Sequence, residues 1–215
     1  MNENYNDVQL AEETRGSLVE RGITLTKIMI AVTVIIYVVT EIAGDTQDAE
    51  FMRSMGALWT MDVIEGGEYY RLVSPIFLHF GAEHVFSNVV LWYFIGDIIE
   101  KEFGRIRYFV VFMISGIAGN ALTMAWEIHT GEYAVSAGAS GAVFGILGAV
   151  LYMVVINKGH YKYISIKRLA FFILLNFVIG FGSTGINYIA HAGGFAAGFM
   201  AAAVLGKRPK NIYPE

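Results

Sequence analysis

A serine and a histidine, each set among small residues, are the side chains in this sequence best suited to chemistry. Ser140 lies in a Gly-Ala-Ser-Gly motif, and His191 lies in an Ala-His-Ala-Gly-Gly motif about 50 residues further along the chain. A histidine that accepts the proton of a serine hydroxyl turns that oxygen into a nucleophile. If the fold places Ser140 and His191 at the same end of two helices, the pair indicates a hydrolase.

Each of these residues also has a structural explanation. A serine between glycines in an apolar helix is typical of close helix packing, with its hydroxyl bonded to a carbonyl one turn earlier. A histidine in such a helix is often a structural hydrogen-bonding group. His84 and Asn88, spaced i and i+4, share one helix face and could equally join two helices. Taken singly, the motifs leave both explanations open.

The composition places the motifs in a membrane protein. Apolar residues make up 55% of the 215 residues, charged residues make up 16%, and the mean hydropathy is +0.52. An ordinary soluble domain of this length has a smaller share of apolar residues and a larger share of charged residues. The chain contains no cysteine, so a catalytic nucleophile must be oxygen or nitrogen, and thiolate metal sites are excluded.

Six apolar segments follow one another, and most are long enough to cross a hydrocarbon core of about 30 Å. They cover residues 23–43, 82–99, 106–126, 137–156, 168–182 and 187–206. We therefore expect an all-α membrane protein with six transmembrane helices. One domain, residues 23–206, would lie between two polar cytoplasmic tails, residues 1–22 and 207–215.

The basic residues predict the orientation of these segments. Of the 15 Lys and Arg residues, 13 lie in the tails, in the connections or at the segment ends on one side of the membrane. Arg53 and Arg71 fall on the other side, in the long first connection. The positive-inside rule then makes both termini cytoplasmic and the protein a multi-pass protein of the cell membrane. The net charge of −4 is spread over tail and loop and does not indicate a nucleic-acid partner.

With this topology, the second, fourth and sixth segments all begin at the outer side of the membrane. His84, Asn88, Ser140 and His191 each lie within the first one or two turns of these segments. At about 1.5 Å per residue, they would lie roughly 5 to 10 Å below the outer surface, where unpaired polar groups are costly. Convergence at one depth favours a functional site over independent structural roles.

Glycines in the fourth and sixth segments predict how the site closes. One face of the fourth segment carries Gly141, Gly145 and Gly148, and the sixth carries Gly194 and Gly198 after His191. Facing glycines let two helix backbones approach closely. This approach would bring Ser140 within hydrogen-bond reach of His191.

Four motifs in this order resemble the rhomboid family of intramembrane serine proteases, from about Tyr70 to Gly198. They are His84-Val-Phe-Ser-Asn88, Gly96-Asp-Ile-Ile-Glu100-Lys-Glu-Phe-Gly104, Gly138-Ala-Ser140-Gly141 and Ala190-His191-Ala-Gly-Gly194-Phe-Ala-Ala-Gly198. The resemblance implies the six-helix rhomboid fold.

The resemblance also implies a reaction. Ser140 would be the nucleophile and His191 its general base, and Asn88 and His84 would form the oxyanion hole with the backbone amide of Ser140. The substrates would be transmembrane proteins in the same bilayer, cut near its extracytoplasmic side, without a metal or other cofactor. They would enter laterally beside the fifth segment, which carries Phe171, Phe172, Phe177 and Phe181.

The sequence departs from the family pattern at two positions. Phe144, one turn after Ser140, stands where the family often has a tyrosine, so packing against His191 would replace a hydroxyl contact. Tyr70-Arg71 replaces a Trp-Arg pair in the first connection, where Trp59, Tyr69 and Tyr70 also fit an interfacial aromatic belt. Glu100 is expected to tie helix ends together.

Two other classes of function remain open. A non-catalytic relative would bind transmembrane clients without cutting them, but such relatives typically lose one of Ser140, His191 and Asn88. A transporter or channel also uses intramembrane His and Asn, but would be expected to carry more buried charge or interrupted helix pairs. The sequence carries no signal for an oligomeric state.

Overall fold

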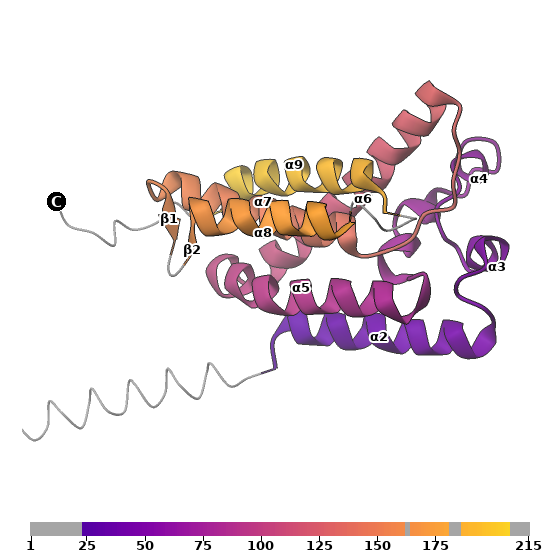
Figure 1. Ribbon diagram of the computed structural model, residues 1–215, viewed down its shortest axis with the longest axis horizontal. Coiled ribbons are helices and arrows are strands. Elements are labelled where there is room, and N and C mark those ends of the chain that lie inside the picture. The colour runs from indigo at the N-terminus through magenta and orange to yellow at the C-terminus, as the bar shows by residue number, and fades with distance from the viewer. Residues whose placement is uncertain (1–22, 162–163, 181–185, 207–215) are drawn as a thin grey trace, which may run out of the picture.

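The computed structural model describes residues 23–161, 164–180 and 186–206, and it is built almost entirely from helices (Figure 1). Six helices match the six apolar segments closely. They are α2 (Leu25–Ala43), α5 (Gly81–Phe103), α6 (Arg105–Thr130), α7 (Ser140–Ile156), α8 (Ile166–Gly180) and α9 (Tyr188–Leu205). The all-α fold class is thus confirmed.

Short elements fill two of the connections. The first connection folds into α3 (Ala49–Ser54), α4 (Thr60–Ile64), η1 (Tyr69–Leu72) and η2 (Ser74–Phe77). After α7, two short strands, β1 (His160–Tyr161) and β2 (Ile164–Ser165), pair antiparallel before α8 begins.

Three of the described helices, α2, α6 and α9, are long and apolar enough to cross a membrane. The shorter α7 is also apolar throughout. Together with the apolar composition, these helices make the chain an integral membrane protein.

Helix α7 forms the centre of the molecule. Most of its residues from Gly141 to Val154 are buried, and α5, α6 and α9 pack around it. Helices α5, α7 and α9 all begin at the end of the molecule that carries α3 and α4, whereas the β1–β2 hairpin marks the opposite end (Figure 1). We call these the α3–α4 end and the hairpin end.

Helices α7 and α9 are in direct backbone contact, as the glycine pattern predicts. A Cβ atom placed on Gly194 would lie 1.9 Å from the carbonyl oxygen of Gly141, and one on Gly198 would lie 2.0 Å from that of Gly145. Real side chains do not tolerate such distances. Only glycine therefore permits this packing, and the predicted close approach is confirmed.

At the hairpin end, Glu100 joins α5 to the start of α2. Its carboxylate accepts hydrogen bonds from the backbone amides of Leu25 and Thr26, both at 2.7 Å, and from the Thr26 hydroxyl. These amides have no partner within α2 itself, because a helix leaves its first N–H groups unpaired. The structural role expected of Glu100 is confirmed.

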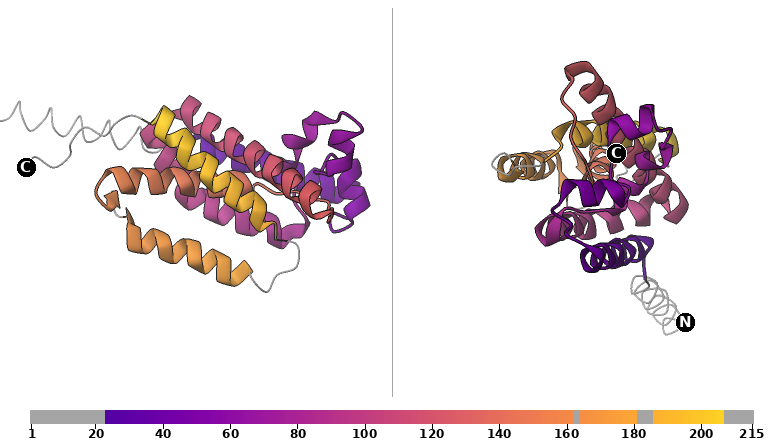
Figure 2. Two further views of the ribbon diagram at one scale, coloured as in Figure 1. Left: turned by 90° about the horizontal axis from the view of Figure 1, so that it is seen from above. Right: turned by 90° about the vertical axis from the view of Figure 1, so that its right-hand side faces the viewer.

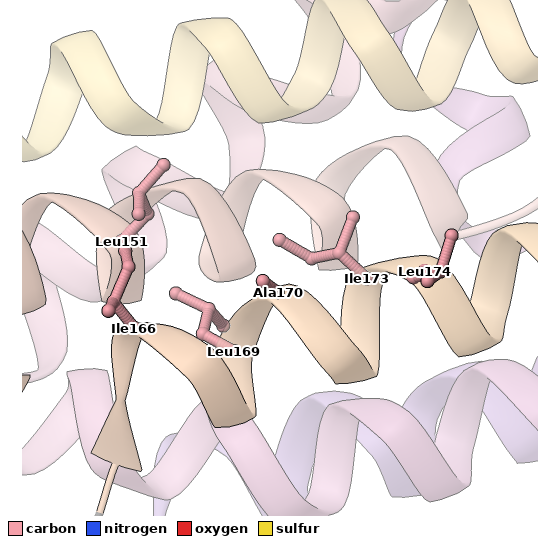
Figure 3. A pocket seen from close by; sticks show the side chains of 6 residues that line it. All are labelled: Leu151, Ile166, Leu169, Ala170, Ile173 and Leu174. Carbon is pink, nitrogen blue, oxygen red and sulfur yellow. The ribbon is translucent and has the colours of Figure 1, made fainter.

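Helix α8 stands apart from the bundle formed by the other long helices, as both views of Figure 2 show. Between α7 and α8 lies a cavity of about 350 Å³. It is lined by apolar side chains, namely Leu151, Ile166, Leu169, Ala170, Ile173 and Leu174 (Figure 3). Leu151 is three turns beyond Ser140, so this cavity is separate from the polar residues near the α3–α4 end.

Of the four phenylalanines expected beside the entry path, only the side chain of Phe171 belongs to the described part, where it is exposed.

Candidate active site

Ser140 is the first residue of α7, at the α3–α4 end of the central helix. The preceding Gly138 has φ +141°, a conformation that L-residues rarely adopt. A Cβ on Gly138 would lie 2.8 Å from Cε1 and 2.9 Å from Nε2 of His84, and 3.7 Å from Oγ of Ser140. The His84 ring and the Ser140 hydroxyl therefore flank the same glycine, which must remain without a side chain.

The segment that leads into Ser140 is held at three points. Ser136 pairs with Leu58 through both backbone hydrogen bonds, at 2.8 and 3.0 Å. The Gly138 amide donates to the Pro75 carbonyl at 2.8 Å, and the Ala139 amide donates to Nε2 of His79 at 3.2 Å. The first connection thus fixes the backbone just before the serine.

His79 is almost fully buried, with 1% of its surface exposed, and its ring lies edge-on to that of His84 with centroids 5.2 Å apart. Burial, together with the nearby His84, lowers the pKa of His79 to about 3. A neutral ring keeps Nε2 available as an acceptor for Ala139. The sequence predicts no role for His79, because the residue lies in a loop where spacing indicates no contact.

His191 lies in the second turn of α9 and stacks on Phe144. The ring centroids are 4.1 Å apart and the planes differ by 7°. Phe144 and Ser140 are four residues apart on α7, so they share one helix face. The imidazole therefore lies beside the face of α7 that carries Ser140. Within the described part of the chain the two side chains form no mutual hydrogen bond, which is common in free enzymes.

Asn88 is buried on α5, and its Nδ2 donates to the carbonyl of His84 at 2.9 Å. His84 and Asn88 thus share a face, as their spacing predicts. The structure places the His84 ring beside Gly138, which the Ser140 hydroxyl also neighbours, and it places His191 beside the face of α7 that carries Ser140. Asn88 lies one turn further along α5.

Arg71 organises the first connection that covers this region. Its guanidinium donates to the carbonyls of Arg53 and Ala57 and pairs with Glu68 and Asp62. Tyr70, whose ring lies 5.3 Å from this guanidinium, is largely exposed. Hydrogen bonding to Arg53 lowers the pKa of Asp62, which keeps its carboxylate charged.

The described residues include no group of three or more His, Cys, Asp or Glu side chains that could hold a metal ion.

Comparison with known proteins identifies the family. Residues 66–208 match the model of the rhomboid domain. The chain is 32% identical over 183 residues to rhomboid protease GluP of Bacillus subtilis, covering 85% of this chain and 35% of that protein. It is 34% identical over 155 residues to the putative rhomboid protease YdcA of the same organism, covering 70% of this chain and 74% of that protein.

A plant relative gives the same result. RHOMBOID-like protein 4 of Arabidopsis thaliana is 38% identical over 160 residues, which cover 74% of this chain and 39% of that protein. The chain thus spans well under half the length of GluP and of this plant relative, and about three quarters of YdcA. A family match over more than half of the chain, together with these relatives, shows that the chain belongs to the rhomboid family.

Proposed function

We propose that this protein is an intramembrane serine endopeptidase that hydrolyses peptide bonds within or beside the transmembrane segments of other membrane proteins. One observation carries the proposal: His191 stacks on Phe144, one turn below Ser140 on the same face of α7. Helices α7 and α9 are in backbone contact there. The rhomboid proteases among its relatives support the same reaction.

In this mechanism, Oγ of Ser140 attacks the scissile carbonyl carbon while His191 takes the hydroxyl proton. The negative charge that develops on the carbonyl oxygen is stabilised by the unpaired amides at the start of α7, aided by Asn88 and His84. His191 then gives the proton to the leaving amine, and the peptide bond breaks. Water hydrolyses the acyl-enzyme by the same steps in turn. Stacking on Phe144 holds the imidazole, in the place of an acidic third residue.

Mutation of the two residues tests this proposal. Ser140→Ala and His191→Ala should each abolish cleavage of a model transmembrane substrate and labelling by a serine-directed phosphonate. Ser87→Ala and His160→Ala are matched controls, because both residues are exposed and should leave cleavage unchanged. Cleavage by purified Ser140→Ala protein would contradict the mechanism. A folded wild-type protein that binds a client but neither cuts it nor takes the label would favour the non-catalytic alternative.

We further propose that six helices span the cell membrane, that residues 1–22 and 207–215 are cytoplasmic tails, and that the α3–α4 end faces the extracytoplasmic side. The distribution of Lys and Arg supports this orientation. The chain has no cysteine, so single-cysteine variants report topology directly. In intact cells, an impermeant maleimide should label Glu132→Cys, in the loop before α7, but not His160→Cys, at the hairpin end. The reverse pattern would overturn the orientation.

The position of the site near one end of its helices also predicts where substrates are cut. A peptide carbonyl within a stable helix is hydrogen-bonded, so the scissile segment must unwind. Cleavage should therefore occur near the outer boundary of the substrate's transmembrane segment, as mass spectrometry of the two fragments would show. Cuts at the cytoplasmic boundary would contradict either the orientation or the role of Ser140.

A further inference from the structure

Asn187, just before α9, makes more contacts than a helix start requires. Its Oδ1 accepts a hydrogen bond from the Ala190 amide at 2.9 Å, and its backbone carbonyl accepts one from the His191 amide at 3.2 Å. These two bonds cap α9 directly before the imidazole. Serine or aspartate would supply the same kind of cap, because only an acceptor oxygen is needed.

The amide nitrogen of Asn187 forms a second set of bonds. Nδ2 donates to Oγ1 of Thr123 on α6 at 2.9 Å and to Oγ of Ser136 at 3.3 Å. Thr123 is itself anchored, since its hydroxyl donates to the carbonyl of Gly119 at 3.0 Å. At Gly119, α6 approaches α9 so closely that a Cβ would lie 2.7 Å from the Ala190 carbonyl oxygen. Asn187 is therefore tied to a tightly packed helix.

The bond between Asn187 and Ser136 has a further consequence for the site. Ser136 precedes Ser140 by four residues, and Asn187 precedes His191 by four residues. Between Ser136 and Ser140 the backbone is held by Pro75 and His79, and between Asn187 and His191 it forms a helical turn. Neither connection can stretch freely, so a shift at this bond would move Ser140 relative to His191.

We propose that Asn187 is a positioning residue, which sets the separation of Ser140 and His191 through its bonds to Ser136 and Thr123. This inference rests on the proposed proteolytic function. It assigns to the side-chain nitrogen of Asn187 a role that the capping oxygen does not fulfil. Displacement of reacting groups by about 1 Å can lower a rate by about 100-fold, so loss of these side-chain bonds should produce a measurable fall in kcat.

Substitution can separate the cap made by Oδ1 of Asn187 from the bonds that its Nδ2 makes to Thr123 and Ser136. Asn187→Ser keeps a capping hydroxyl but is too short to reach Thr123 and Ser136, whereas Asn187→Ala loses both functions. We expect Asn187→Ser to lower kcat about 10-fold, with KM and melting temperature near those of the wild type. The rate of phosphonate labelling of Ser140 should fall by a similar factor. Ser136→Ala should show the same pattern, and Ser136→Thr should restore the wild-type rate.

A double variant and a distant cap serve as controls. Because Asn187→Ser already removes the bond to Ser136, adding Ser136→Ala should lower kcat no further than Asn187→Ser alone. Asp48→Ala removes the cap of α3, where Oδ1 of Asp48 accepts from the Phe51 amide at 2.6 Å, and should leave kcat unchanged.

Three outcomes would overturn the inference: wild-type kcat in Asn187→Ser, fully additive losses in the double variant, or a kcat loss in Asp48→Ala as large as that in Asn187→Ser. If Asn187→Ser does not fold, wild-type kcat in Ser136→Ala would by itself overturn it. Failure of the proposed function would look different, because wild-type protein would then neither cleave substrate nor take the phosphonate label.

Discussion

His191 and Phe144 lie ring upon ring, with centroids 4.1 Å apart and planes that differ by 7°. Phenylalanine at position 144 has no hydroxyl, so it offers the imidazole only its face. The orientation of the proposed base therefore depends on packing.

Removal of this ring face should slow catalysis without preventing folding. An aromatic pair contributes about 0.5–1.5 kcal/mol beyond its buried area, so Phe144→Leu should lower kcat about 2-fold to 10-fold. Phe144→Tyr keeps the ring and should retain kcat. Phe112→Leu is the matched control, because it removes a similar stack with Trp92, at 4.4 Å and 13°, away from the site. Phe112→Leu should reduce the stability of the protein but not the kcat of the folded fraction. An equal kcat in Phe144→Leu and the wild type would contradict the proposed role of the stack.

Asn88 is expected to act on the transition state. Loss of one oxyanion donor typically lowers kcat by about 10²-fold to 10³-fold, so Asn88→Ala should do so with little change in KM. Ser87→Ala is a close control, since Ser87 also donates to the His84 carbonyl at 2.9 Å but is exposed. Steady-state kinetics on both variants would decide the matter. An unchanged kcat in Asn88→Ala would contradict the oxyanion role and leave Asn88 with only its bond to the His84 carbonyl within α5.

The backbone contact between α7 and α9 should not tolerate a side chain. A Cβ on Gly194 would lie 1.9 Å from the Gly141 carbonyl oxygen, so Gly194→Val should lower melting temperature and activity together. Ala196→Val, two residues further along α9 on an exposed face, should leave both nearly unchanged. Thermal unfolding in detergent and a cleavage assay test this pair. A stable and active Gly194→Val protein would show that the two helices do not need this approach.

Glu100 is expected to stabilise the fold without taking part in chemistry. In Glu100→Gln, one of the two carboxylate oxygens becomes an NH₂ group, which would face the amide of either Leu25 or Thr26, itself a donor. An unsatisfied buried group costs about 1–3 kcal/mol, so the melting temperature should fall while the kcat of folded protein stays the same. Glu65→Gln, at an exposed position, serves as the control. A variant that is fully stable but inactive would contradict this assignment.

His79 should make the folded protein sensitive to acid. In the unfolded chain a histidine binds a proton below a pKa of about 6.5, whereas burial lowers the pKa of His79 to about 3 in the folded protein. Its neutral state therefore contributes fully above pH 6.5, and stability is lost as the pH falls from 6.5 toward 3. At pH 5 the loss is about 2 kcal/mol.

Melting curves of the wild type and His79→Gln between pH 5 and pH 7.5 would measure this effect. Glutamine can still accept a bond from the Ala139 amide but does not titrate in this range. The melting temperature of His79→Gln should consequently depend less on pH than that of the wild type. Parallel curves for the two proteins would show that His79 is not held neutral by the fold.

The sequence by itself determined the helices and indicated the residues proposed to carry the chemistry. Each apolar segment became a helix because a chain within a membrane must satisfy its backbone hydrogen bonds internally. The approach of α7 and α9 was equally predictable from Gly141, Gly145, Gly194 and Gly198, since small residues permit close backbones. Motif order was sufficient to indicate the rhomboid family, which the comparisons confirm.

Only the tertiary structure decided how those residues are held in place. The stack of Phe144 on His191 was a predicted contact, but its nearly parallel geometry depends on the crossing of two helices. The bonds from the Ala139 amide to His79 and from Asn187 to Ser136 join segments about 50 or more residues apart in the chain. Loop residues show no periodicity, so sequence spacing cannot predict such partners. They become neighbours only when the packing of α5, α6, α7 and α9 brings the ends of their connections together.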